Sequence, residues 1–180
     1  MLKKLYPYQY VESVFSIDYN ELYKKGYKAI IFDIDNTLVP HGKDSTKQVD
    51  KLFKTIQNVG FKTLLLSNNT EERVKRFLKN INSLYICDAE KPKVENYLKA
   101  IEMLNVKKEE VIYVGDQIFT DIYGANKSDI ASILVKYIGY YENGKKGIKR
   151  NIEKIVLKLY ELNRKYRNRL GNIEKLEENK

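Results

Sequence analysis

The stretch Ala29-Ile30-Ile31-Phe32-Asp33-Ile34-Asp35-Asn36-Thr37 places two carboxylates and a hydroxyl directly after a short apolar run. The run is too short for a helix and is typical of a strand buried on both faces of a parallel sheet. Open α/β sheets bind ligands at the carboxyl ends of their strands, where Asp33 is predicted to lie. Two like charges this close repel each other, so we expect a divalent metal ion with oxygen ligands beside them.

Taken alone, the Asp-x-Asp-x-Thr pattern fits a strand end with an Asx turn and a helix cap equally well. Three further polar clusters favour the functional interpretation, because each follows another short apolar run. They are Ser67-Asn68-Asn69, Lys91-Pro92, and Gly115-Asp116-Gln117 with Thr120-Asp121. The loops that leave the strands of a parallel sheet meet at one edge, so these side chains are predicted to converge on a single cleft.

The order of these motifs resembles the haloacid-dehalogenase-like superfamily of phosphohydrolases, with the match carried by residues 28–136. Its four motifs correspond to Asp33/Asp35/Thr37, Ser67, Lys91, and Gly115-Asp116 with Asp121. The phrases over 35–40 and 114–121 are similar to the YqeG family of small subfamily IIIA phosphatases. The relatives of that family include phosphatidylglycerophosphate phosphatases. The resemblance implies an α/β fold, a three-layer α/β/α Rossmann-like core with a mainly parallel sheet.

Phosphomonoester cleavage needs an in-line nucleophile and cations that absorb the developing charge. Asp33 is the predicted nucleophile, forming an aspartyl-phosphate, and Asp35 the predicted general acid and base. In the resembling superfamily the residue at Asp35 also gives its backbone carbonyl to the metal. Mg²⁺ is the predicted cofactor, because it takes few protein carboxylates and keeps phosphate and water as other ligands.

Two acids after the 111–114 run complete the predicted metal site. Asp116 is the best further ligand, and Gly115 lets the backbone pass close to the site. Asp121 either orients a metal-bound water or completes the acidic cluster. The alternative for Asp121 is an acid that favours the N-terminus of a helix.

The remaining candidates are predicted to bind the phosphoryl group. Ser67 and Asn68 would hold phosphate oxygens. Lys91 would neutralise the phosphoryl group and keep Asp33 ionised, although a lysine before Pro92 also suits a solvated helix start. Thr37 would bind phosphate or stabilise the turn. His41 is interpreted as a loop residue near the substrate.

The 180 residues are predicted to form one domain over 1–170, with its core at about 28–136, a basic helix at about 147–170 and a polar tail at 171–180. Only 34 positions separate Asp33 from Ser67, and 24 separate Ser67 from Lys91. These intervals leave no room for a large cap domain, so the cleft should admit bulky substrates.

Asp18 is predicted to cap a short helix that ends near Gly26. Strands are predicted at 28–33, 61–66, 83–87, 110–114 and 130–135, and helices at 46–59, 70–80, 92–105 and 120–127.

Positive charge is concentrated near the end of the chain. Of the net charge of +9, residues 136–170 contribute 11 basic and 3 acidic groups. Apolar residues in this segment have helical spacing, and they are predicted to form one face: Ile148, Ile152, Ile155, Val156, Leu159, Leu162 and Tyr166. On another face lie Arg150, Lys154, Lys158 and Lys165. The apolar stripe is expected to dock on the core, and the basic face to be solvated or to contact anionic lipid or nucleic acid.

The sequence is expected to be that of a cytoplasmic protein, which would lie at the inner face of the membrane if its substrate is a lipid. No stretch approaches the length of apolar residues that a spanning helix needs, and no signal core follows Lys3 and Lys4. The single cysteine, Cys87, lies in an apolar run and is interpreted as a core residue.

Together these features predict a Mg²⁺-dependent phosphomonoester phosphatase, with phosphatidylglycerophosphate as the favoured substrate. A soluble phosphate ester or a nucleic-acid end is the enzymatic alternative. A basic module that binds nucleic acid without turnover is the alternative of another class.

Overall fold

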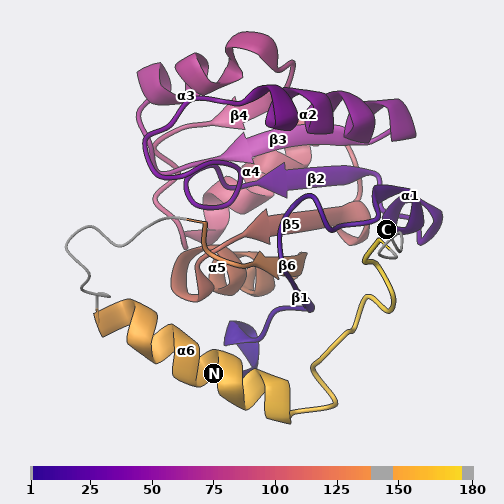
Figure 1. The fold of residues 1–180 in the computed structure, drawn as a ribbon, viewed down its shortest axis with the longest axis vertical. Helices are drawn as coiled ribbons and strands as arrows, with labels where there is room; N and C mark the ends of the chain where they lie inside the picture. The colour runs from indigo at the N-terminus through magenta and orange to yellow at the C-terminus, as the bar shows by residue number, and fades with distance from the viewer. Residues whose placement is uncertain (1, 139–147, 176–180) are drawn as a thin grey trace, which may run out of the picture.

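The computed structural model describes residues 2–138 and 148–175, with side chains from Arg150 onward in the second range. Its centre is a six-stranded sheet in the order β1-β6-β5-β2-β3-β4 (Figure 1), and every pairing in it is parallel. The strands are β1 Gln9–Val11, β2 Ala29–Phe32, β3 Lys62–Leu66, β4 Leu84–Ile86, β5 Val111–Gly115 and β6 Ala131–Val135. The predicted parallel α/β sheet is confirmed.

Helices cover both faces of this sheet. They are α1 Tyr19–Lys24, α2 Lys47–Val59, α3 Glu71–Phe77, α4 Val94–Leu104, α5 Tyr123–Lys127 and α6 Ile148–Leu162. Apolar residues of α1, α2 and α3 pack on one face, and those of α4 and α5 on the other. Strand residues alternate between the two cores: Ile30 and Phe32 face the first, and Ala29 and Ile31 the second. This arrangement is the predicted three-layer sandwich.

Local sequence signals set the helix ends that matter for the site. Thr46 accepts a hydrogen bond from the Val49 amide at the start of α2, and Gly60 ends the helix in the left-handed conformation. Asp18 caps α1 through the Glu21 amide, as predicted. In place of one helix over 120–127, a single π-helical turn, Ile118–Ile122, precedes α5.

No inserted domain separates the motifs within the described residues. The chain passes from β2 to α2 through the loop 33–46, and from β3 to α3 through the loop 67–70. The prediction that a large cap is absent agrees with this course of the chain. No helix among residues 2–138 and 148–175 is both long and apolar enough to cross a membrane.

Strand β1 was not predicted. It forms the edge of the sheet, pairing Gln9–Val11 in parallel with Ile133–Val135 of β6. Three residues beside Pro7, in a segment rich in tyrosine, carry too little alternation to indicate a strand. An edge position also tolerates a strand this short.

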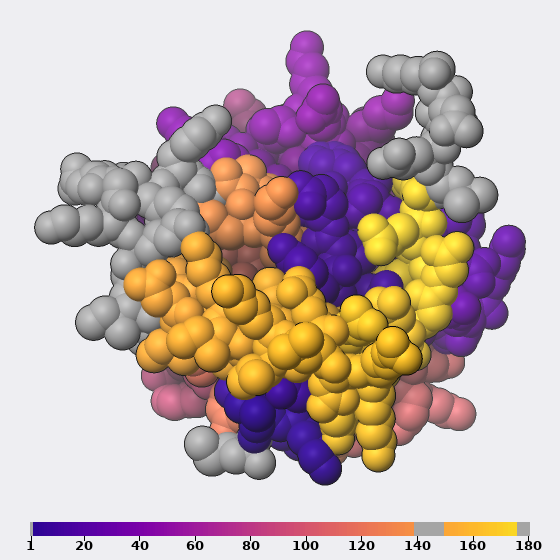
Figure 2. Space-filling model, turned by 60° about the horizontal axis from the view of Figure 1, so that its bottom comes forward, coloured from indigo at the N-terminus to yellow at the C-terminus, as the bar shows by residue number. Residues whose placement is uncertain are grey.

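The prediction for the last helix was wrong in its orientation and length. Helix α6 ends at Leu162 rather than near 170 and buries Glu153, Val156 and Tyr160. Much of the predicted docking stripe is exposed instead: Ile152, Ile155, Leu159 and Leu162. The reason is that Glu153 and Arg150 have partners in the core, so the helix turns this mixed face inward. Figure 2 shows α6 crossing one face of the molecule.

The predicted polar tail over 171–180 is also corrected in its described part. Ile173 is fully buried, its carbonyl accepts from the Asp18 amide at 2.7 Å, and Glu174 bridges to Ile17. One isoleucine among polar residues has no periodicity to reveal it. Residues 176–180 of the predicted tail lie outside the described residues.

Two neighbouring residues of α6 test its orientation. Replacing Val156, which is 5% exposed, with alanine should lower the free energy of unfolding by about 1–2 kcal/mol, because two buried carbons are removed. Replacing Ile155, which is 59% exposed, should change it by less than about 0.5 kcal/mol. Urea denaturation of both variants measures the difference. A larger loss for Ile155→Ala would mean that the helix docks through its aliphatic stripe.

Candidate active site

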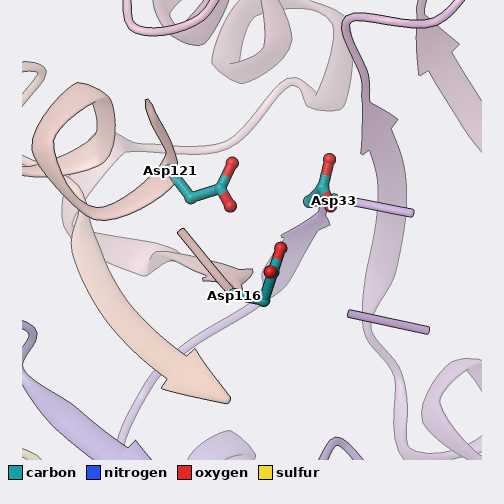
Figure 3. Close-up of side chains that lie close together, drawn as sticks. All are labelled: Asp33, Asp116 and Asp121. Carbon is teal, nitrogen blue, oxygen red and sulfur yellow. The ribbon is translucent and has the colours of Figure 1, made fainter. Parts of the chain in front are cut away.

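Three buried carboxylates converge at the carboxyl edge of the sheet (Figure 3). Asp33 follows β2, Asp116 follows β5, and Asp121 lies in the π-helical turn. One oxygen from each lies within 4.8 Å of the other two. Parallel strands bring these residues together although more than eighty positions separate Asp33 from Asp121 in the chain.

Lys91 ties this acidic cluster together. Its ammonium group donates to Asp33 Oδ1 at 2.5 Å, to Asp121 Oδ1 at 2.7 Å and to the Tyr113 hydroxyl at 3.1 Å. The side chain is buried, so the alternative of a solvated lysine is wrong. Asn68 positions the backbone here, because its side-chain oxygen accepts from the Lys91 amide at 2.8 Å.

Thr37 lies between two of the carboxylates. Its buried hydroxyl donates to Asp33 Oδ2 at 3.2 Å and lies 3.4 Å from Asp116 Oδ1. Gly115 provides the space for Asp121, since a Cβ atom at Gly115 would lie 2.5 Å from the Cβ of Asp121. The close passage of the backbone predicted for Gly115 is therefore present.

Asp35 belongs to a separate group beside the cluster. Its Oδ1 accepts from Arg73 Nη2 at 3.0 Å, and its Oδ2 from Asn69 Nδ2 at 2.9 Å. His41 Nδ1 lies 3.1 Å from Asp35 Oδ2, on a largely exposed side chain. Asp35 is part of the lining of the cleft, and these neighbours hold its carboxyl group in one orientation.

Three of the four predicted phosphate-binding residues, Ser67, Asn68 and Lys91, line a cleft of about 170 Å³ at this edge, whereas Thr37 is not part of its lining. Ser67 is buried in its wall, and its hydroxyl oxygen accepts from the Asn69 amide at 3.2 Å. Asn68 is exposed at the rim. The lining of this cleft comprises Asp33, Asp35, Asn36, His41, Ser67, Asn68, Asn69, Lys91, Gln117 and Thr120.

The electrostatics of the cluster favour a bound cation. Burial and the nearby Asp121 charge raise the pKa of Asp33 to about 6 against the opposing effect of Lys91. Burial, with the charges of Asp121 and Asp33, raises the pKa of Asp116 to about 8. Burial lowers the pKa of Lys91, but the adjacent carboxylates outweigh it and hold that pKa above its usual range.

A divalent metal fits this donor set. The carboxylates of Asp33, Asp116 and Asp121 outnumber the two cations that contact them, Lys91 and Arg150. All the ligand atoms offered are hard oxygens, which Mg²⁺ and similar ions prefer. Asp35 was predicted to offer the metal its backbone carbonyl, and its carboxylate accepts from Arg73 and Asn69 rather than joining the acidic cluster.

Several residues at the site were missed from the sequence. Arg150 and Glu153 of α6 contact Asp116 and the turn that follows it. Lys91 contacts Tyr113, and Asp35 contacts Arg73. Tyr113 is indistinguishable from a core residue of β5, and Arg73 from a surface residue of α3, because neither lies in a recognisable motif. Glu153 follows Arg150 by three positions, a spacing common to exposed ion pairs on a helix, so it gave no signal of burial.

The geometry agrees with comparisons with known proteins. A family model for haloacid dehalogenase-like hydrolases matches residues 44–129. The chain is 32% identical over 159 residues to a Bacillus subtilis protein named "Probable phosphatase YqeG", covering 87% of this chain and 92% of that protein. A glyceraldehyde 3-phosphate phosphatase from Pyrococcus furiosus is 42% identical over 52 residues, covering 29% of this chain and 22% of that protein.

Solved structures show the same fold. An uncharacterized protein from Listeria monocytogenes serotype 4b superposes with a TM-score of 0.51 at 20% identity, covering 76% of this chain and 99% of that chain. These findings and the site define a class, the haloacid-dehalogenase-type phosphatases. The chain belongs to the haloacid dehalogenase-like hydrolases and, within them, to the YqeG family. Hydrolases of this superfamily use a divalent metal, and the acidic cluster is placed to hold one.

The raised acid pKa values predict how stability depends on pH without metal. The folded protein holds these protons more tightly than the unfolded chain, so stability is lost as pH rises through about 6 for Asp33 and about 8 for Asp116. Asp116→Asn should therefore raise the free energy of unfolding at about pH 9 by about 1.4 kcal/mol or more, the equivalent of one pKa unit. The gain should be smaller at about pH 5. Urea denaturation in EDTA measures both, and an equal gain at the two pH values would contradict the assignment.

Proposed function

We propose that this protein is a Mg²⁺-dependent phosphomonoester phosphatase that works through an aspartyl-phosphate on Asp33. The observation that carries the proposal is the placing of Asp33. Its carboxylate is held by Lys91 and Thr37 inside an acidic cluster, yet it also lines the cleft that Asp35 faces. A nucleophile in a fixed orientation beside a proton donor is what in-line transfer requires.

The chain's own residues account for the proton and phosphoryl transfers. The Asp33 carboxylate attacks phosphorus, and the bond from phosphorus to the leaving oxygen breaks while Asp35 donates a proton to that oxygen. Asp35 then takes a proton from the water that attacks the acyl phosphate, which releases phosphate and restores Asp33. A Mg²⁺ ion held by Asp33, Asp116 and the Asp35 carbonyl, with Asp121 nearby, would supply charge neutralisation on the phosphoryl oxygens.

The neighbours of the two acids have supporting roles. Lys91 would neutralise the phosphoryl group and keep Asp33 ionised, and Ser67 and the NH₂ group of Asn68 would bind its oxygens. Thr37 is engaged with Asp33, so we assign it to orienting the nucleophile rather than to the phosphate. Arg73 and Asn69 would hold Asp35 toward the leaving group.

For the substrate we favour phosphatidylglycerophosphate or a similar anionic lipid. A cleft of about 170 Å³ can hold a phosphoryl head but not the rest of a large molecule. Helix α6 begins at the site and exposes an aliphatic stripe that includes Ile155 and Leu162, which is 81% exposed. Exposed lysines at 154 and 158 flank it, the combination that suits an anionic membrane surface. The enzyme would then work at the cytoplasmic face of the membrane.

The first test is phosphate release from phosphatidylglycerophosphate in mixed micelles and from p-nitrophenyl phosphate. We expect release with Mg²⁺, none with EDTA, and a loss of at least about a thousandfold in Asp33→Asn, since the nucleophile is removed. Activity on the soluble ester alone would keep the phosphatase and reject the lipid. Salt-sensitive RNA binding without any Mg²⁺-dependent hydrolysis would reject the enzyme in favour of a binding module.

The membrane contact predicts a second difference. Replacing Ile155 and Leu162 together with aspartate should lower phosphate release from anionic vesicles by about tenfold or more, because each aliphatic side chain buried in lipid contributes about 1.5–3 kcal/mol. Activity on a soluble ester should fall far less. Leu98 and Met103 are exposed on α4, so their double aspartate variant is a matched control. Equal losses on vesicles for both variants would count against α6 as the contact surface.

A further inference from the structure

The guanidinium group of Arg150 donates two hydrogen bonds to Asp116, one of the three acids of the cluster. Arg150 Nη2 donates to Asp116 Oδ2, and Nη1 donates to the Asp116 backbone carbonyl at 3.0 Å. Both contacts are made by one planar group, which fixes the side chain and the backbone of Asp116 relative to each other. The Asp116 side chain is fully buried, so water does not compete for these contacts.

Glu153, one turn further along α6, completes the contact. Its Oε2 accepts from Arg150 Nη1 at 3.0 Å, and its Oε1 accepts from the amides of Ile118 at 2.8 Å and Phe119 at 3.4 Å. Those amides open the π-helical turn that carries Asp121. Arg150 therefore holds Asp116, and Glu153 holds the start of the turn that carries Asp121. The two residues together position both acids.

The two oxygens of Asp116 have different partners. Oδ2 is taken by Arg150, whereas Oδ1 lies 3.4 Å from the Thr37 hydroxyl that also contacts Asp33. Rotation of the carboxylate about its bond to Cβ would break the contact with Arg150. The guanidinium group thus keeps Oδ1 turned toward Asp33, where a shared cation would be bound.

We propose that Arg150 and Glu153 are positioning residues that preorganise Asp116 for the divalent metal. This inference rests on the proposed function for the identity of the metal site. It explains why α6 buries a charged pair in place of its aliphatic stripe. Partners that orient a metal ligand are typically worth about 10–100-fold in metal affinity.

A cavity gives direct chemical access to the pair. It has a volume of about 310 Å³, and its lining includes Arg150, Glu153 and Asp116 together with apolar, tyrosine and lysine side chains. In Arg150→Ala this cavity would extend to the Asp116 carboxylate. Free guanidinium can then enter and restore the missing contact, which no general loss of folding would allow.

The experiment measures Mn²⁺ binding to the full chain by calorimetry, with phosphatase activity alongside. We expect Arg150→Ala to weaken Mn²⁺ binding by about 10–100-fold, and millimolar guanidinium chloride, but not urea, to restore part of it. Arg150→Lys should also lose affinity, because an ammonium group cannot contact the carboxylate, the carbonyl and Glu153 together. Glu153→Gln should show a smaller loss. Lys99→Ala removes one positive charge from the exposed face of α4 and should bind as wild type does.

The outcomes separate this inference from the proposed function. If the wild-type chain binds Mn²⁺ and turns over, but Arg150→Ala and Arg150→Lys bind Mn²⁺ equally well, the positioning role is overturned and the phosphatase stands. Tighter binding in Arg150→Ala would also overturn it, because Arg150 would then compete with the metal. A wild-type chain that binds no Mn²⁺ would overturn both. If Arg150→Ala does not fold, Arg150→Lys and Glu153→Gln decide.

Discussion

The arrangement of the site depends on one buried ion cluster, in which the Lys91 ammonium group lies between Asp33 and Asp121. Burying charges is costly unless each has a close partner of opposite sign. Lys91 provides that partner for two acids, and Arg150 provides it for the third. The cations still leave an excess of negative charge, so the cluster remains an attractive site for a divalent ion.

The same constraint explains the orientation of α6. An aliphatic stripe would normally turn toward the core, where burial of each side chain is favourable. Here the buried Asp116 needs a cation, and the first turn of α6 supplies Arg150 with Glu153 as its own partner. The stripe is left exposed. One electrostatic requirement thus both neutralises part of the acidic cluster and leaves an apolar stripe of α6 exposed.

The open cleft and the exposed stripe of α6 indicate how this member of the family would recognise a substrate. Membership in the YqeG family establishes a phosphatase, and the described loops after β2 and β3 hold no cap over Asp33 and Asp35. A substrate would therefore be recognised by its phosphoryl group in the cleft and by contacts outside it. The anionic lipid that we propose as substrate would meet the second condition through contacts with α6.

The sequence was enough to predict the parallel α/β fold and the polar residues that gather at the carboxyl edge of its sheet. Short apolar runs each followed by a polar cluster have one compact solution, a parallel sheet whose strand ends meet, and Asp33, Lys91, Asp116 and Asp121 do meet there. Periodicity reports only which residues are apolar, so it predicted that Ile155 would be buried, whereas Ile155 is exposed and Glu153 is buried. Only the tertiary structure shows the orientation of α6. Turning Arg150 and Glu153 toward the core is favourable because Arg150 pairs there with Asp116, which lies 34 positions away in the chain. Pairings over that distance arise from packing, and no local pattern encodes them.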